Sequence, residues 1–154
     1  MRIAATQFGV VTRAQLLAAG LSSSAIGRRV AGGLLVPLYR GVYAVGHTAI
    51  TRQGRALAAQ LACGDQAVLG FEDAAAHMGL MAPTSPVWHI VVPRPSPRGH
   101  SGIRVHRMRL AERDIVTDGP LRHTSLARTA LDLAAAGPER RVRRLLREAE
   151  IRRV

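Results

Sequence analysis

The chain has 154 residues, 47% of them hydrophobic but only 3% aromatic, which suits one ordinary domain or two small ones with cores of Ala, Leu and Val. All 22 basic residues are arginines, and the formal net charge of +12 favours nucleic acid or another anionic surface as the partner. The lack of lysine excludes phosphate-loop lysines, Schiff-base chemistry and Ser-x-x-Lys nucleophiles.

Two short helices are predicted at the N-terminus. Thr12 and Gln15 have the spacing of a capping box, in which each side chain accepts a hydrogen bond from the other residue's amide. Gly20 is the kind of residue that follows a helix end. These signals bound a helix over residues 13–19, and a weaker helix over residues 2–8 precedes it.

A third helix and a hairpin are predicted next. One of Ser22, Ser23 and Ser24 can cap a helix over residues 24–31, and Gly32-Gly33 ends it. The apolar strings at residues 34–39 and 42–45 flank Arg40-Gly41 and predict a hairpin, whose first strand Pro37 confines to a sheet edge. Helix, tight turn, helix and hairpin is the order of a winged helix-turn-helix.

The two faces of the helix over residues 24–31 favour DNA binding. Ile26 and Val30 lie four residues apart and form an apolar stripe for its own core. Ser24 and Arg28 lie opposite and can meet bases and phosphates in a major groove, while Arg40 at the hairpin tip can reach a neighbouring backbone or minor groove. Residues 1–46 carry five arginines and no acidic residue, which agrees with this interpretation. A helix-turn-helix that contacts protein is the alternative.

The remainder, residues 47–154, predicts a mixed α/β domain. Gly46-His47-Thr48 is expected to be a linker, and Thr51 is expected to cap a helix through Ala62. Strands are expected at residues 67–70, 87–92, 103–109 and 114–118. Further helices are expected at residues 73–79 with Asp73 as the N-cap, from Thr124 or Ser125 to Ala136, and from Pro138 onward.

No catalytic site, cofactor or metal site is predicted. Cys63 is the sole cysteine, so a disulfide framework and a cysteine metal cluster are both excluded. The six histidines lack helical metal-binding spacing, although His89 and His106 can face each other on neighbouring strands. Glu72-Asp73 cannot share a helix face for paired carboxylate catalysis. Arg128 and Asp132 are expected to form an exposed ion pair.

Other arginines outside residues 1–46 fall into two groups. A secondary basic surface is assigned to Arg52, Arg55, Arg104 and Arg107. The arginines from residue 140 onward are interpreted as the solvated face of an amphipathic helix, with a second nucleic-acid surface as the alternative. No apolar run approaches the ~20 residues of a membrane span and no signal segment is recognised, so a cytoplasmic protein is expected.

Several segments together point to a known family. In chain order they are GVVTRAQLLAAGLSSSAIGRRVAGG, YRGVYAVG, TRQGRALAAQLACG, AVLGFEDAAAHMGL, IRVHR and TSLARTALDLAAAG. The ordered set resembles the AbiEi-family antitoxins of type IV toxin–antitoxin systems, in the form common among actinobacteria.

The resemblance implies an α+β protein, with a winged helix-turn-helix at residues 1–46 and a small mixed α/β antitoxin-type domain at residues 47–154. It implies a transcriptional repressor that binds inverted repeats in its own promoter. It also implies a nucleotidyltransferase-like toxin encoded alongside, with which no stable complex is required. The recognition helix falls on Ser22 to Ala31 and the wing on Leu35 to Val45. The expected DNA-binding residues are Arg13, Ser22, Ser23, Ser24, Arg28, Arg29 and Arg40.

A second hypothesis belongs to another class. Many relatives continue into a C-terminal endonuclease-like domain, which this chain is expected to lack, so no nuclease activity is carried over. The chain can then be read as a non-catalytic interaction or targeting module, the front half of a two-domain endonuclease-like protein. Such a module would bind DNA without sequence preference and act through a partner.

Overall fold

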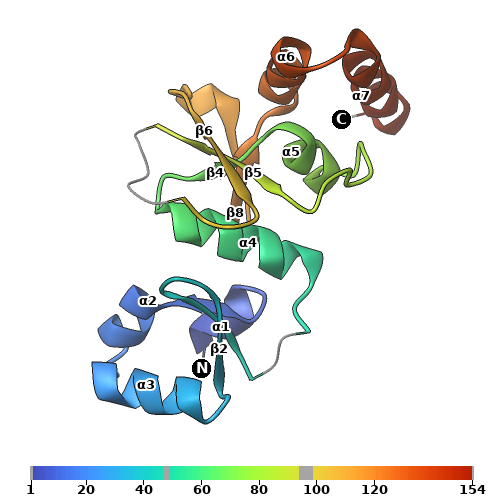
Figure 1. The fold of residues 1–154 in the computed structure, drawn as a ribbon. Helices are drawn as coiled ribbons and strands as arrows, with labels where there is room; N and C mark the ends of the chain where they lie inside the picture. The colour runs from blue at the N-terminus through green and yellow to red at the C-terminus, as the bar shows by residue number, and fades with distance from the viewer. Residues whose placement is uncertain (1, 47–48, 94–98, 154) are drawn as a thin grey trace. The chain divides into compact units, whose positions relative to one another are not determined.

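A three-stranded antiparallel sheet organises the first part of the chain in the computed structural model, which describes residues 2–46, 49–93 and 99–153 (Figure 1). Contacts between Cα atoms divide the chain into two compact units, Met1–Asp65 and Gln66–Val154. The elements of the first unit are α1 (Arg2–Thr6), β1 (Val10–Thr12), α2 (Arg13–Ala18), α3 (Ser23–Ala31), β2 (Leu35–Tyr39), β3 (Val42–Val45) and α4 (Arg52–Cys63).

Both faces of this sheet are covered by helices. The strand order is β1-β3-β2, which leaves β2 at an edge, as Pro37 predicted. Side chains alternate along each strand. Val11 of β1 therefore packs with Leu16 of α2 and Ile26 of α3, whereas its neighbour Val10 packs with Ala58 of α4. The α2–α3 helix pair and the β2–β3 hairpin thus follow one another in the order that predicted a winged helix-turn-helix.

The predicted boundaries of α2 and α3 are confirmed to within one residue, because they depend on local hydrogen bonds. Helix α1 is shorter than predicted and ends at Thr6 rather than at residue 8. The Gln15 amide donates to Thr12 Oγ1 at 3.1 Å and the Thr12 amide donates to Gln15 Oε1 at 2.9 Å, which is the expected capping box. Gly20 follows α2 with φ +88°, and the Leu21 amide then donates to the Leu16 carbonyl at 3.1 Å. The left-handed turn at Gly20 sets where α3 begins.

Helix α4 belongs with the first unit, because it packs on β1, β2 and β3. The division by contacts therefore falls after Asp65, whereas the sequence places a functional boundary after Gly46. The predicted linker residues His47 and Thr48 lie outside the described residues. The predicted cap is confirmed: the Gly54 amide donates to Thr51 Oγ1 at 3.1 Å.

Two glycine substitutions are expected to have opposite effects on the first unit. A Cβ at Gly54 would lie 2.9 Å from the Phe8 carbonyl oxygen, so Gly54→Ala should destabilise the unit by about 1–2 kcal/mol. A Cβ at Gly27 in α3 meets nothing within 4 Å, so Gly27→Ala should stabilise it by about 0.5–1 kcal/mol. Amide hydrogen exchange in β1 and β3 measures both effects. Equal protection in the two variants would contradict this account of α4 packing.

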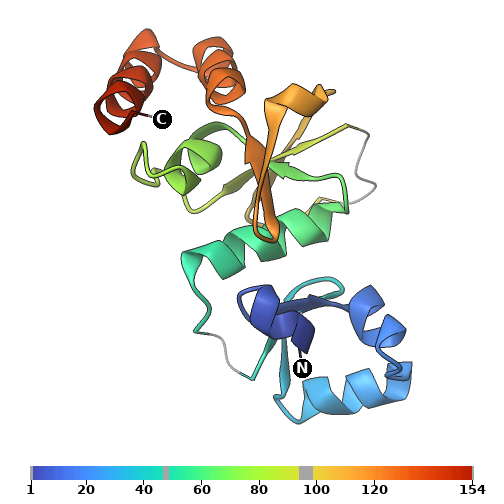
Figure 2. The ribbon, with the colours of Figure 1, turned by 180° about the vertical axis from the view of Figure 1, so that it is seen from behind.

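The second unit is a five-stranded mixed sheet with three helices (Figure 2). Its elements are β4 (Val68–Leu69), α5 (Phe71–His77), β5 (Trp88–Val92), β6 (Ile103–Arg107), a 3-10 turn η1 (Glu112–Asp114), β7 (Ile115–Asp118), β8 (Leu121–Thr124), α6 (Leu126–Ala136) and α7 (Glu139–Arg152). The strand order is β6-β5-β4-β8-β7, with β5·β6 and β4·β8 parallel and the other pairs antiparallel.

One apolar cluster joins the sheet of this unit to its helices. Val68 of β4 and Val91 of β5 pack with Leu133 of α6 and Leu145 of α7, and all four side chains are buried. Helix α6 contacts both α5 and α7. The predicted mixed α/β content is thus confirmed for the second unit.

Three predictions for this unit need correction. Helix α5 begins at Phe71 rather than after Asp73, and its N-cap is Gly70. Asp73 is instead buried, and its Oδ2 accepts a hydrogen bond from the His89 amide at 2.8 Å, so it ties α5 to β5. Strand β8 was not predicted. The Arg128–Asp132 pair forms, but Asp132 is buried rather than exposed.

Candidate nucleic-acid interface

Helix α3 presents a polar face opposite its buried one. Ile26 is 3% exposed and faces the core, whereas Ser24 and Arg28 are exposed on the other side of the helix. The Ser22 hydroxyl accepts from the Ala25 amide at 3.2 Å and caps the helix. The fold therefore leaves the predicted reading residues of α3 accessible to a ligand.

Arg13 links the start of α2 to the start of α3 and to the hairpin tip. Its guanidinium donates to Ser23 Oγ at 2.7 Å, and its backbone amide donates to the Gly41 carbonyl at 2.7 Å. Arg40, which precedes Gly41 at the tip, is exposed. These contacts bring Arg13, Ser23 and the Arg40-Gly41 turn together on one side of the first unit. The sequence predicted these residues separately, and it had no signal for the bonds between them.

Arg29 differs from Arg28 although the two are adjacent. Its guanidinium donates back to the Ala25 carbonyl at 3.2 Å, and its side chain is half-buried along its own helix. Arg28 is exposed, and among the described residues no carboxylate forms an ion pair with it. Of the two, Arg28 is therefore the better placed to contact a base edge.

The charge of the first unit is strongly one-sided. It holds seven arginines and a single acidic residue, Asp65. A surplus of arginines over carboxylates attracts polyanions, because phosphates can supply the missing negative charge. The polar face of α3 and the hairpin tip thus combine accessible hydrogen-bond donors with uncompensated positive charge.

The predicted secondary basic residues are divided between the two units. Arg52 and Arg55 are exposed in the first turn of α4, within the first unit. Arg104 and Arg107 are exposed on β6 of the second unit. Because they lie three residues apart on a strand, they point to opposite faces of the sheet. A role for these four arginines in binding remains a prediction.

The predicted approach of His89 and His106 is observed. His89 Nδ1 lies 3.0 Å from His106 Nε2, and the ring of Phe71 stacks on His106. Among the described residues, no three His, Cys, Asp or Glu side chains are grouped so that they can hold a metal ion.

Burial raises the pKa of Cys63 to about 11, so its thiol is protonated at neutral pH.

His106 is expected to make the second unit sensitive to acid. Burial, followed by the charges of His89 and Arg104, lowers its pKa from 6.5 to about 4. Between these values the unfolded chain binds a proton that the folded chain does not. Stability should therefore fall as pH falls from 6.5 to 4, by at most about 1.4 kcal/mol per pH unit, because the ring is partly solvated.

Urea unfolding at pH 7 and at pH 5 measures this effect, with His106→Gln as the comparison. Glutamine keeps a polar group beside His89 but does not titrate. The free energy of unfolding should therefore depend less steeply on pH in the variant. Part of it should remain, because burial also lowers the pKa of His123. An unchanged slope in the variant would show that His106 is not the responsible group.

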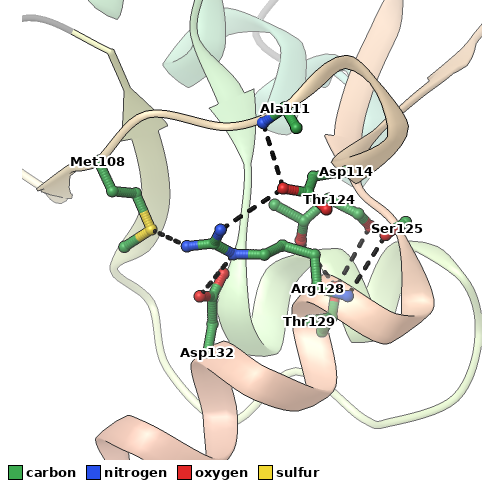
Figure 3. Close-up of polar contacts among 8 residues, drawn as sticks. All are labelled: Met108, Ala111, Asp114, Thr124, Ser125, Arg128, Thr129 and Asp132. Carbon is green, nitrogen blue, oxygen red and sulfur yellow. Dashed lines mark hydrogen bonds and ion pairs between the residues drawn. The ribbon is translucent and has the colours of Figure 1, made fainter.

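Arg128 is the centre of a polar cluster in the second unit (Figure 3). Its Nε donates to Asp132 Oδ1 at 2.9 Å, one terminal nitrogen lies 3.6 Å from Asp114 Oδ2, and the other donates to Met108 Sδ at 2.8 Å. The second carboxylate oxygen of Asp132 is buried without a hydrogen-bond partner in the described structure. Burial raises the pKa of Asp132 although Arg128 opposes the shift.

This cluster holds the fold together. Arg128 of α6 connects that helix to η1 and to the residue that follows β6 (Figure 3). Thr124 Oγ1 and Thr129 Oγ1, both buried, lie 2.7 Å apart beside it. The TSLARTALD segment therefore has a structural role, because its side chains fix α6 against the sheet.

Comparison with known proteins finds a similarity in the N-terminal region. Residues 1–46 match the family model described as "Transcriptional regulator, AbiEi antitoxin", and the matched region runs through α1, the α2–α3 pair and the β2–β3 hairpin. No curated protein matches the chain. None of the helices among the described residues has the length and apolar character needed to cross a membrane. Residues 1–46 are therefore similar to the AbiEi antitoxin transcriptional regulators, the family that the ordered sequence segments resemble.

Proposed function

We propose that the chain is a DNA-binding transcriptional repressor and the antitoxin of a type IV toxin–antitoxin system, which represses its own promoter. Helix α3 reads the major groove with Ser24 and Arg28, and the Arg40-Gly41 hairpin tip contacts the neighbouring backbone or minor groove. Inverted repeats in the promoter are the proposed target.

One observation carries this proposal. Arg13 holds the start of α3 and the hairpin tip together, on a unit whose only acidic residue lies at its end. A protein partner is a poorer match for this one-sided charge, because most protein interfaces are depleted in charged residues at their centre. Duplex DNA can accept hydrogen bonds from the exposed polar face of α3, and its phosphates can balance the excess of arginines.

The remaining assignments follow from the same proposal. Residues 1–46 supply the DNA contacts, and residues 47–154 supply the antitoxin function without catalysis. A nucleotidyltransferase-like toxin encoded alongside is the proposed counterpart, and no stable complex with it is required. A promoter-binding repressor acts in the cytoplasm, which is the localisation we propose.

Footprinting of the full chain on the DNA upstream of its own gene tests the proposal. We expect protection of two repeated half-sites. If 4 to 6 arginines meet phosphates, log K should fall against log salt with a slope of roughly −4 to −5. No protection at moderate salt would overturn the repressor assignment. Co-expression with the neighbouring reading frame tests the antitoxin role separately. Expression of that frame alone should stop growth, and co-expression of this chain should restore it.

A further inference from the structure

Helix α7 in the second unit carries a row of arginines on the side that faces away from its core. Leu145 and Ala149 are buried against the rest of the unit. Arg140, Arg144 and Arg147 are all exposed and, at 100° per residue, lie on the opposite side of the helix. We call these three residues the α7 arginine row.

The row differs from the other arginines of α7 in its partners. Arg141 pairs with Glu72 at 2.6 Å, Arg143 with Glu139 at 2.8 Å, and Arg152 with Glu148 at 3.7 Å. Among the described residues, no carboxylate lies within ion-pair distance of the row. Its members are spaced i, i+4 and i+7, so their like charges repel and weaken the helix slightly. The positive charge of the row therefore does not stabilise the fold and is available to an anionic ligand.

The spacing of the row suits a phosphate backbone. At 1.5 Å rise per residue, the first and last arginines are separated by about 10 Å along the helix, which spans two or three phosphates of one strand. Each guanidinium can donate two parallel hydrogen bonds to one phosphate. Such contacts are independent of base sequence.

We propose that the α7 arginine row is a second nucleic-acid surface, which binds the backbone of duplex DNA without sequence preference. The proposal rests on the proposed function for its ligand, since DNA held by the first unit is at high effective concentration for the second. A membrane surface is a poorer match, because an interfacial helix needs an apolar face toward the lipid. The apolar face of α7 is occupied by its own core, and Ile151 is the one large apolar residue aligned with the row.

A triple variant of the full chain, R140Q/R144Q/R147Q, tests the proposal. Glutamine has nearly the helix propensity of arginine, so α7 should persist, and circular dichroism checks that it does. We expect binding to a random duplex to weaken tenfold or more at low salt, and the slope of log K against log salt to become shallower by roughly 2 to 3. The preference for an upstream half-site over random DNA should not change.

A charge-matched control removes two exposed arginines that belong to neither predicted basic surface, R109Q/R113Q, and is compared with the double α7 variant R144Q/R147Q. It should keep nearly the wild-type slope. Wild-type affinity and slope in the α7 variant would overturn the proposal, and so would an equal loss in the control, since net charge alone would then explain it. Loss of binding to vesicles containing phosphatidylglycerol with unchanged DNA binding would also overturn it, in favour of a membrane surface.

These results can be separated from failure of the proposed function. Wild-type protein that showed no preference for upstream DNA would overturn sequence-specific repression. The random-duplex slopes of the wild type, the α7 variant and the control would still decide whether the row binds DNA.

Discussion

Arg28→Ala is expected to weaken binding to the upstream half-site by about 1–3 kcal/mol and to reduce the preference for that site over random DNA. Arg28 is exposed on the polar face of α3, opposite the buried Ile26, so the fold itself does not depend on its charge. An arginine that contacts a guanine edge contributes to specificity, whereas one that contacts phosphate contributes equally on all sequences. Fluorescence anisotropy with matched specific and random duplexes measures both affinities.

Arg2→Ala is the control for Arg28→Ala. Arg2 is also exposed and belongs to the same unit, but it lies on α1, outside the proposed interface. It should lower both affinities slightly and leave their ratio unchanged. If Arg28→Ala behaved in the same way, Arg28 would be a backbone contact and the reading residues would have to lie elsewhere on the unit.

Arg128→Met is expected to destabilise the second unit by about 2–4 kcal/mol. The substitution removes the partner of Asp132, whose carboxylate is buried and whose second oxygen already lacks a hydrogen bond within the described structure. It also breaks the contacts from α6 to Asp114 and Met108. Urea unfolding followed by the fluorescence of Trp88, which lies in this unit, measures the loss.

The double variant Arg128→Met/Asp132→Leu is the control for this prediction. Removing both charges leaves no buried unpaired group, so much of the stability should return. In the single variant, the pKa of Asp132 should rise further because Arg128 no longer opposes the shift. Its stability relative to wild type should then recover as pH falls through that raised pKa, since the folded chain takes up the proton more readily. A double variant as unstable as the single one would contradict the account of Asp132.

Elements of the first unit were predictable where their signals are local. The capping box of Thr12 and Gln15 and the turn at Gly20 involve residues at most five apart, so the sequence alone indicates them. The bond from Arg13 to Gly41 joins residues far apart in the chain, and no spacing rule reports it. The sequence could therefore predict which side of α3 is exposed to a ligand. It could not predict that Arg13 fixes the hairpin tip beside the start of α3.

In the second unit the errors arise where tertiary contacts override local preference. Asp73 is a good N-cap residue, but α5 starts earlier, with Phe71 at φ +52° stacked on His106. The packing of that ring offsets the strain of a left-handed backbone in a residue other than glycine. Strand β8 is only four residues long and includes Arg122 and His123, so its pattern does not stand out. Burial of Asp132 depends on η1 and on the residue after β6, which the i,i+4 spacing does not report.

Selection of bound sequences from a random duplex pool by the full chain is the most direct test of the central claim, that α3 and the hairpin form a sequence-reading DNA surface. The account predicts enrichment of one motif, which recurs upstream of the protein's own gene, and loss of that enrichment with Arg28→Ala. A recovered pool with the composition of the input would contradict it, even if the protein bound DNA tightly, because binding would then rest on arginine–phosphate contacts alone.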